Sequence, residues 1–340
     1  MTTPPTFSPV NNFGGFAKDA SQGGNTAMTM TLGTTKPVGW NDKPEWLEDN
    51  SLRGVMTDGP FATVQGVQIG ELTFPESPIY VDSFGFPAVN ILGDLTVTGG
   101  AAPYTNAIAL LNSVSGQPSN HTFEEFYGPG THNARMFTGV CFNELVIIWD
   151  VQKKLLSWSG KAACYMSTPA AATPTDAQSG VLPIPSWRFL LGVAGPASGG
   201  TQDITCKSGK ITITREVSAE FTGMNSPTPY IIQRGAARAK FDDLLFVAKD
   251  EGPYNLMANN TRPQLQLVFD NGLAAAAHGA LQIDANVGSY RSVQTDNSGK
   301  AVMWKASGKF EANSTNTGTS GGLSPLKLTL TNAVASGTYQ

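Results

Sequence analysis

The sequence predicts a mainly β protein with two antiparallel β units in tandem, each a sandwich or partial barrel that carries one short α-helix. Three observations predict this class. Apolar and polar residues alternate in stretches such as Lys210–Thr214 and Gln264–Phe269, as in half-buried strands. The 340 residues include 37 Gly and 22 Pro, which supply many turns without reaching the level of a disordered chain. Short motifs recur about 150 residues apart, which indicates an internal repeat.

The repeat consists of anchors that occur twice in the same order. A Ser-Pro dipeptide followed by a Tyr and a Gly occurs at Ser77–Gly85 and again at Ser226–Gly235. A Pro-Tyr dipeptide and a Trp followed by Ser-Gly-Lys also recur, at residues 103–104 and 158–161 and then at 253–254 and 304–309. Offsets of 150 and 148 residues between the copies predict a tandem duplication of a unit of about 130 residues.

The anchors and the composition divide the chain into five parts. Prolines 169, 174 and 183 mark the central part as an extended linker. The predicted parts are an N-terminal arm (1–45), a first β unit (46–167), the linker (168–184), a second β unit (185–318) and a C-terminal strand or arm (319–340).

The terminal parts differ from the two units. In the N-terminal arm, Thr29–Leu32 is the one strand candidate. Near the C-terminus, Leu326–Thr331 alternates after a flexible stretch, and a tethered strand suits pairing with a distant sheet edge of the same or a neighbouring subunit. We therefore expect subunits that lack the chain from Leu323 onward to fold but to polymerise poorly.

Within the units, strands and one helix each can be placed. In Tyr104–Val114, apolar residues recur with the i, i+3, i+4, i+7 spacing of an amphipathic helix, and Tyr254–Asn260 is its shorter counterpart. Strands of the first unit are expected at Thr122–Phe126, Gly139–Ile148 and Lys154–Tyr165.

Charge and hydropathy exclude several functions. The formal net charge is −4, and tight binding to nucleic acid requires clustered Lys and Arg. No uncharged apolar run approaches the length that spans a bilayer, and the N-terminus carries no recognisable secretory signal. We therefore expect neither membrane insertion nor tight DNA binding.

Residues that carry chemistry are sparse. Cys141, Cys164 and Cys206 form no C-x-x-C pair, and no phosphate-binding, dinucleotide-binding or H-E-x-x-H motif occurs. Ser320 lies in a G-x-S-x-G match, but its polar flanks lack the strand and helix of a hydrolase elbow. The sequence therefore predicts no catalytic, metal or cofactor site, and no enzyme.

A histidine and glutamate cluster is the strongest candidate for a chemical site. His121 and His132 flank Glu124 and Glu125, so a metal or acid–base site is conceivable there. Phe126–Gly130 between them is typical of a tight hairpin turn. We therefore interpret these groups as polar residues on exposed hairpin ends.

The element order and four segments resemble those of a known family. The segments are Glu48–Gly54, Ile211–Val217, the paired Ser-Pro and Tyr units, and Phe123–Lys161 with its terminal Trp-Ser-Gly-Lys. Over about residues 46–318 the chain resembles the major tail tube proteins of long-tailed bacteriophages, and within them the larger members with two tube domains in tandem.

The resemblance implies a structural virion protein of the phage tail, assembled in the host cytoplasm. It implies rings that stack into a tube, to which each domain contributes an inner four-stranded sheet and through which double-stranded DNA passes without specific binding. A trimer with pseudo-sixfold symmetry is favoured and a hexamer is the alternative. Implied partners are the tape measure protein and the tail terminator and tip proteins.

Six residues are nominated for structural roles. The resemblance also implies that Arg53 and Arg215 form ion pairs between domains or subunits. From the repeat, we expect the remaining four to occupy equivalent places where a strand starts and turns, with positive φ at the glycines: Tyr80, Gly85, Tyr230 and Gly235.

Two alternatives and one charge asymmetry stay open. The alternatives are the inner tube of a contractile injection system and a carbohydrate-binding β-sandwich or adhesin, although the repeated Trp158 and Trp304 are expected in the core. Residues 1–170 carry a net charge of −6 and residues 171–340 carry +2. Unlike-charged domains would meet if the two alternate around a ring, which predicts salt-sensitive assembly.

Overall fold

The computed structural model describes residues 12–51, 60, 62–113, 115–128, 133–152, 155–170, 174–178, 180–197, 202–223 and 225–340. In these parts of the chain, antiparallel strands form three sheets of eight, six and five strands, which confirms the mainly β class. They also contain the helices α1 (Val81–Leu92) and α2 (Gly252–Ala258) and a 3₁₀ turn (Ala275–Ala277).

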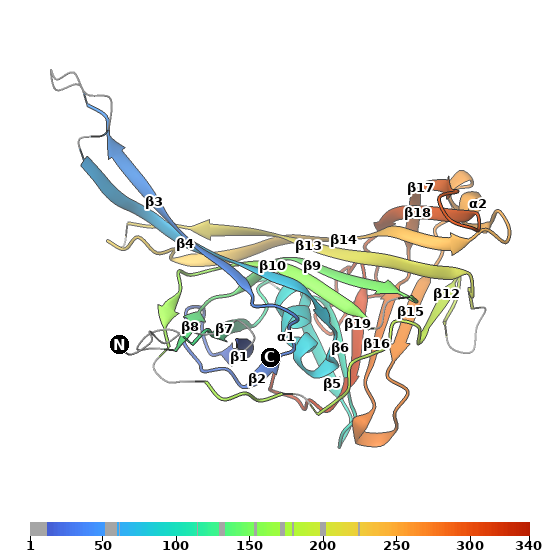
Figure 1. Ribbon diagram of the computed structural model, residues 1–340, viewed down its shortest axis with the longest axis horizontal. Coiled ribbons are helices and arrows are strands. Elements are labelled where there is room, and N and C mark those ends of the chain that lie inside the picture. The colour runs from blue at the N-terminus through green and yellow to red at the C-terminus, as the bar shows by residue number, and fades with distance from the viewer. Residues whose placement is uncertain are drawn as a thin grey trace, which may run out of the picture.

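The eight-stranded sheet is the long upper layer in Figure 1, and α1 and the other strands cover one of its faces. The hairpin of β3 and β4 extends beyond the layer. In spatial order the strands are β17 (Gly288–Asp296), β18 (Met303–Phe310), β14 (Ile231–Val247), β13 (Cys206–Glu220), β9 (Cys141–Asp150), β10 (Ser157–Cys164), β4 (Ala62–Pro78) and β3 (Gly39–Asp49).

Two smaller sheets complete the body. In spatial order the six-stranded sheet contains β12 (Phe189–Val193), β15 (Leu265–Asp270), β16 (Ala280–Ala285), β19 (Lys327–Asn332), β6 (Tyr104–Leu110) and β5 (Gly93–Thr98). The five-stranded sheet contains β11 (Thr168–Pro169), β8 (Ala134–Phe137), β7 (Asn120–Phe126), β1 (Phe13–Asp19) and β2 (Met30–Leu32). Most of the strands expected from alternation are therefore confirmed, with bounds shifted by a few residues.

Alternation along β9 shows why the eight-stranded sheet has one covered and one open face. Leu145, Ile147 and Trp149 are buried, whereas Val146 and Ile148 between them are only half-buried. Successive side chains of a strand point to opposite faces, so the first set faces the core and the second faces the open side. The sheet thus separates the hydrophobic core from an open surface.

Aromatic rings fill the core between the sheets. Phe74 stacks on Phe142 with ring centroids 5.0 Å apart and meets Phe123 edge to face at 5.2 Å. The helix α1 runs through this core and every one of its residues is buried. A helix with no solvent-facing side is apolar nearly all round, and Gly93 in the left-handed conformation (φ 99°) ends it.

The internal repeat is visible in the eight-stranded sheet. Four strands of the first half, in the order β9, β10, β4, β3, adjoin four strands of the second half in the order β17, β18, β14, β13. Gly160 of β10 lies opposite Phe74 of β4, and Gly308 of β18 lies opposite Phe241 of β14. The two Ser-Gly-Lys motifs are therefore structurally equivalent.

The other repeated anchors do not mark equivalent places. Ser77–Tyr80 leads from β4 into α1, whereas Ser226–Tyr230 connects β13 to β14. Gly85 lies inside α1 and Gly235 inside β14, and neither has a positive φ. The expectation of turn glycines at these two positions was wrong, because a short motif without a matching burial pattern does not fix an element.

The predicted helix Tyr104–Val114 is also wrong. Tyr104–Leu110 forms β6, which pairs with β5 on one side and with β19 on the other. Hydrogen bonds to two remote strands outweigh the local helical spacing of its apolar residues. The actual helix, α1, was missed because it contains Gly85 and Pro87, whereas α2 agrees with the short helix expected near Tyr254.

The N-terminal region contains more structure than the arm expected from its composition. Besides β2, the structure places β1 between β7 and β2, and β3 beside β4. Gly15 in β1 lies so close to the backbone of Met30 that a Cβ atom would collide with it. Glycines that permit this approach made the segment look like a loop in the sequence.

The C-terminal strand belongs to its own subunit. Strand β19 lies in the interior of the six-stranded sheet, between β16 and β6, and Leu326, Leu328 and Leu330 are fully buried. Removal of the chain from Leu323 onward would expose the neighbouring strands and open the core. The expectation that such a truncated subunit folds is therefore corrected.

The last residues of the chain pack against α1. The Tyr339 hydroxyl donates a hydrogen bond to the carbonyl of Asp82, and the Tyr339 ring is buried beside Phe86 at 5.0 Å. A Cβ atom at Gly85 would overlap this ring. Glycine is required at position 85 by the close approach of Tyr339 and not by backbone conformation.

We predict that Gly85→Ala lowers the free energy of unfolding by about 2 kcal/mol, because the added methyl group overpacks the Tyr339 slot. An unobstructed Gly-to-Ala change inside a helix would instead stabilise by about 1 kcal/mol, so the sign is decisive. Urea denaturation of the variant and the wild type measures this change in the free energy of unfolding. Gly100→Ala, where a Cβ atom meets nothing within 4 Å, is the control and should leave stability nearly unchanged.

Candidate functional surface

The histidine and glutamate cluster is buried and not on exposed hairpin ends as expected. His121, Glu124 and Glu125 lie on β7 with at most 3% of their surface exposed, because β1 and β8 pair on both sides of the strand. The imidazole of His121 lies 2.9 Å from the amide nitrogen of Asn90 and 2.9 Å from the carbonyl oxygen of Tyr339. His132 lies outside the residues that the structure describes.

Burial shifts the pKa values of these groups. Desolvation lowers the pKa of His121 to about 3, and it raises the pKa of Glu125 to about 7 although the carboxylate accepts the N–H of Val38 at 3.0 Å. His121 and Glu125 thus each already have a backbone hydrogen-bond partner, Tyr339 and Val38 respectively. Among the residues described, no group of three His, Cys, Asp or Glu side chains is arranged to hold a metal ion.

The remaining candidate nucleophiles are occupied or buried. The Ser320 hydroxyl lies 2.5 Å from the Asp94 carboxylate, which also accepts the Ser320 N–H at 2.7 Å. Asp94 also accepts the Thr319 hydroxyl at 2.8 Å, so these bonds hold a loop against β5 and use the carboxylate to fix the loop. Cys141, Cys164 and Cys206 are buried, and desolvation raises the pKa of each thiol, which disfavours the reactive thiolate.

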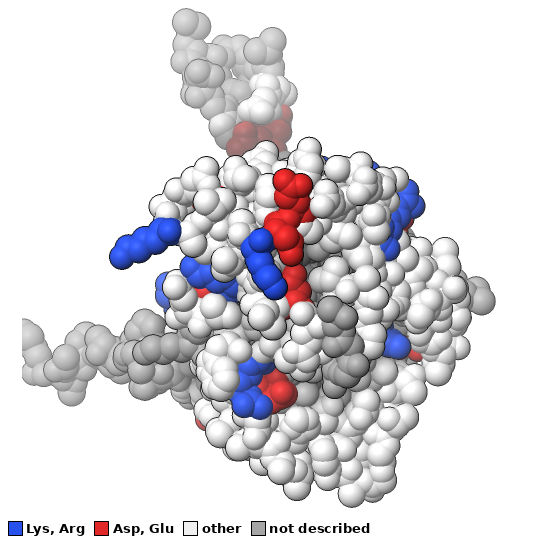
Figure 2. Space-filling view, turned by 90° about the vertical axis from the view of Figure 1, so that its right-hand side faces the viewer, with Lys and Arg blue, Asp and Glu red and all other residues white. Residues whose placement is uncertain are grey.

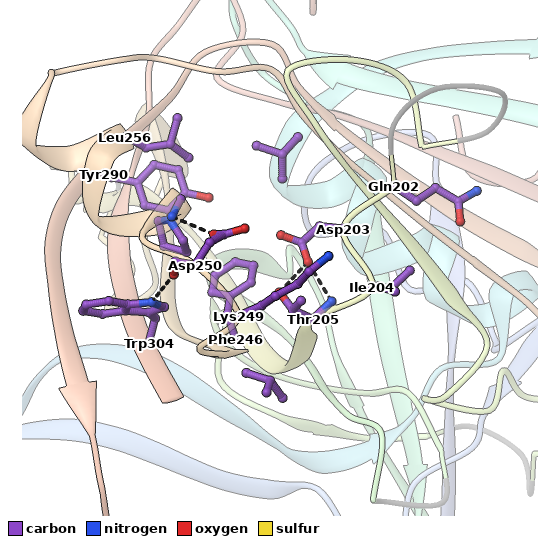
Figure 3. Close-up of a pocket in the computed structure, with 14 residues that line it drawn as sticks. Gln202, Asp203, Ile204, Thr205, Phe246, Lys249, Asp250, Leu256, Tyr290 and Trp304 are labelled. Carbon is purple, nitrogen blue, oxygen red and sulfur yellow. Dashed lines mark hydrogen bonds between the residues drawn. The ribbon is translucent and has the colours of Figure 1, made fainter. Parts of the chain in front are cut away.

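A pocket of about 400 Å³ lies beside α2 at one end of the eight-stranded sheet (Figure 3). Its two acidic side chains, Asp203 and Asp250, already accept hydrogen bonds from neighbouring residues of the chain. Asp203 accepts hydrogen bonds from the backbone and hydroxyl of Thr205, and Asp250 accepts the N–H of Gly252. Trp304 donates to the carbonyl of Asp250 at 2.7 Å. This arrangement stabilises the loops and presents no converging catalytic groups.

Arg215 ties the two halves of the chain together. Its guanidinium donates to the carbonyls of Ile91 (2.8 Å), Gly116 (2.6 Å) and Gly235 (3.0 Å). Carbonyls at the C-terminal end of α1 carry partial negative charge, so they replace the acidic partner that was expected. Burial lowers the pKa of Arg215 to about 10, and Arg53 lies outside the described part of the chain.

The tryptophans do not form a sugar-binding platform in the described chain. Trp158 is fully buried among core phenylalanines, as expected, and Trp304 is half-buried and stacks on Tyr254. Trp40, Trp46 and Trp187 are more exposed, and Trp40 and Trp187 each have a neighbouring arginine over the ring. No exposed pair is left that would stack on successive sugars.

Charged residues on the open side of the eight-stranded sheet occur as neighbouring pairs of opposite sign. Asp243 accepts from Lys305 at 2.8 Å and from Lys210 at 3.0 Å, and these bonds lower the pKa of its carboxyl. Further ion pairs on the sheet join Lys43 with Glu71, Lys161 with Glu144, Arg238 with Glu216, and Lys240 with Asp242.

In these ion pairs the positive and negative charges largely cancel on the surface of the protein. Figure 2 views the end of the molecule that carries α2, where blue and red groups lie next to each other on a mainly white surface. A surface of this kind has no run of free cations that would neutralise phosphates. These pairs were not predicted from the sequence, although charged residues occur at alternating positions, such as Arg238 and Lys240 on β14.

Among the described residues, the sheet also ends in two unpaired edges, β3 and β17. Open edges and long hairpins with exposed apolar side chains, such as Trp46 and Val64 at 59% and 63% exposure, are features of proteins that associate. A family model described as phage tail tube protein matches residues 2–331. The chain belongs to the phage tail tube protein family. No curated protein matches the sequence.

Membership in the tail tube family identifies the protein as a structural component of the virion tail and implies self-assembly into a tube. The recognition of a phage tail tube protein from the sequence is confirmed at this level. Within the described residues of this tail tube protein, no helix is long and apolar enough to cross a membrane.

We predict that Glu125→Gln gains stability over the wild type as the pH rises. The folded pKa of about 7 exceeds the unfolded value of 4.5. Between these values the unfolded state loses its proton first, so the wild type loses stability with rising pH. The variant keeps an acceptor for Val38 and escapes this loss, with a difference of up to about 3 kcal/mol above pH 7.

Thermal unfolding of both proteins between pH 4 and 8 measures the difference. Because His121 is present in both, its own opposing titration cancels in the comparison. A stability difference that is constant over this pH range would show that Glu125 titrates normally in the folded protein.

Proposed function

We propose that this tail tube protein forms rings that stack into the tail tube of a long-tailed phage, and that the tube conducts genomic DNA during ejection. The observation that carries the proposal is the eight-stranded sheet, to which each half of the chain supplies four adjacent strands. In this proposal the halves are two tube domains joined by the linker 168–184. The first extends the expected residues 46–167 to include all of β3 (Gly39–Asp49), and the second is residues 185–318.

The strand number favours a ring of three chains. Three copies of the eight-stranded sheet provide 24 strands, and strands about 4.8 Å apart with a tilt of about 40° give a backbone circumference of roughly 150 Å. Such a ring leaves room for a double helix after side chains line it. Six chains would double the circumference to roughly 300 Å, which is far more than DNA requires.

The paired charges suit a conduit. A wall that faces DNA must neither bind phosphates strongly nor repel them enough to block passage. Ion pairs on the open face, such as Asp243 with Lys210 and Lys305, meet both requirements. We propose further that the tape measure protein occupies the tube during assembly in the host cytoplasm, and that terminator and tip proteins close its ends.

The purified full-length protein is expected to form rings or tubes in negative-stain images, with a mass of three chains per ring by native mass spectrometry. Surface ion pairs between halves of net charge −6 and +2 would make assembly weaker at high salt. A monodisperse monomer at every protein and salt concentration tested would contradict the proposal.

We predict that Asp243→Asn makes assembled tubes bind double-stranded DNA, because it frees Lys210 and Lys305. Two new phosphate contacts per site would steepen the dependence of log affinity on log salt by about 2. Co-sedimentation of tubes with DNA at increasing salt measures this. The matched control, Asp270→Asn, removes the same charge from a pair with Arg188 in the six-stranded sheet and should change nothing. Equal DNA binding by both variants would contradict a lining role for the open face.

A further inference from the structure

Within the eight-stranded sheet, the two halves of the chain meet at a joint that can be described residue by residue. Strands β9 and β13 pair antiparallel across it, with Ile147 opposite Ile211 and Leu145 opposite Ile213. This joint continues the sheet from the first half of the chain into the second. Two further strands, β17 and β3, end the sheet on either side, and neither has a second neighbouring strand in the part of the chain that the structure describes.

The two end strands are the counterparts of the two joint strands. Strand β17 lies beside β18 as β9 lies beside β10, and β3 lies beside β4 as β13 lies beside β14. A second copy of the chain could therefore repeat the joint by placing its β3 against β17 of the first copy. The repeated geometry also determines which residues would face each other.

The register on β17 follows from the equivalent glycines. Gly160 lies opposite Leu145, and Gly308 lies opposite Tyr290. One residue earlier, Ser159 lies opposite Val146 and Ser307 lies opposite Ser292. Tyr290 and Ser292 therefore correspond to Leu145 and Val146, with Arg291 as an extra, bulged residue.

The register on β3 follows from the equivalent phenylalanines Phe74 and Phe241. The residue before each, Thr73 or Lys240, pairs with Gly39 of β3 or Thr212 of β13. Gly39 therefore corresponds to Thr212. At the internal joint Thr212 lies opposite Val146.

We propose that β17 of one copy pairs antiparallel with β3 of the next copy, with Ser292 opposite Gly39 and Tyr290 opposite Trp40. The proposal rests on the ring assembly proposed above and names the surface that closes it. Trp40, 41% exposed in the single chain, takes the place of the buried Ile213 and is covered by the neighbour. Each ring then contains alternating internal and intermolecular joints of the same design.

Local hydrogen bonds limit the internal joint and the proposed intermolecular joint at corresponding residues of β9 and β17. At the start of β9, the N–H of Phe142 is already bonded to the side chain of Asn90 at 2.9 Å, and the internal joint begins two residues later. At the start of β17, the N–H of Gly288 is already bonded to the carbonyl of Pro263 at 2.9 Å. The free edge of β17 therefore begins at the place that corresponds to the start of the internal joint.

The proline in β3 agrees with this register. Pro44 has no N–H to donate, and prolines in strands are confined to positions that need no ladder hydrogen bond. In the proposed register Pro44 lies beyond the first residue of β17, Gly288, so no intermolecular bond is lost. Past this point β3 and β4 continue as the hairpin that leaves the sheet (Figure 1).

Disulfide cross-linking in full-length protein tests the register. Gly39→Cys and Ser292→Cys, combined in one chain, place two thiols on directly opposite residues, within the Cα separation that a disulfide requires. A Cβ atom at Gly39 meets only ordinary contacts at 3.6 Å or more. The three native cysteines are buried, so oxidation should act on the introduced pair.

We expect oxidised tubes of the double variant to give dimers and trimers on a non-reducing gel, with the series ending at three chains. The control is Asn41→Cys with Ser292→Cys, which shifts one thiol by two residues on the same face of β3 and should cross-link at least tenfold less. Tubes of each single variant under reducing conditions show that the substitutions permit folding.

Two results would overturn the proposed joint. Normal tubes in which neither pair cross-links, or in which the shifted pair cross-links equally well, would show a different contact between copies while the tube itself stands. A wild-type chain that forms no rings or tubes would overturn both the joint and the proposed function.

Discussion

Backbone hydrogen bonding between β9 and β13 is the constraint on which the rest of the structure depends. Because seven residue pairs run from Glu144–Thr214 to Asp150–Ser208 without interruption, the two halves form one sheet and not two separate domains in loose contact. Arg215 reinforces the joint by donating to the carbonyl of Ile91 in α1 and to that of Gly116 in the loop between β6 and β7. As far as the chain is described, this sheet ends in two open edges, β17 and β3, and open edges favour association with another copy.

Because the eight-stranded sheet is a single layer, one of its faces is buried against the core and the other carries paired charges. The strands must be apolar where they cover α1 and the aromatic core, and the alternation of side chains leaves every second residue on the open side. Asp243 between Lys210 and Lys305 shows how cations are retained there without being free. Such pairs leave few free cations on this surface to bind phosphates.

Sequence reasoning was most successful where local pattern and tertiary environment agree. The alternation in β9, β13 and β15 predicted strands, and the repeated Ser-Gly-Lys predicted equivalent strands in the two halves. It failed where the environment overrides the pattern. Tyr104–Leu110 has helical spacing but pairs with two strands, and α1 contains Gly85 and Pro87 yet forms a helix because the core and Tyr339 enclose it.

The sequence by itself determined the mainly β class, the family and the paucity of reactive groups, because composition, alternation and a repeated motif are properties of the chain alone. The tertiary structure decided that His121 and Glu125 are buried, that β19 completes a sheet of its own subunit and that Lys210 and Lys305 of the open face both meet the carboxylate of Asp243. The burial of His121 and the place of β19 depend on contacts between residues more than a hundred positions apart, such as Asn106 with Asn332, whereas the ion pairs join residues that are closer in the sequence. No local pattern records which remote strand will lie beside a given one.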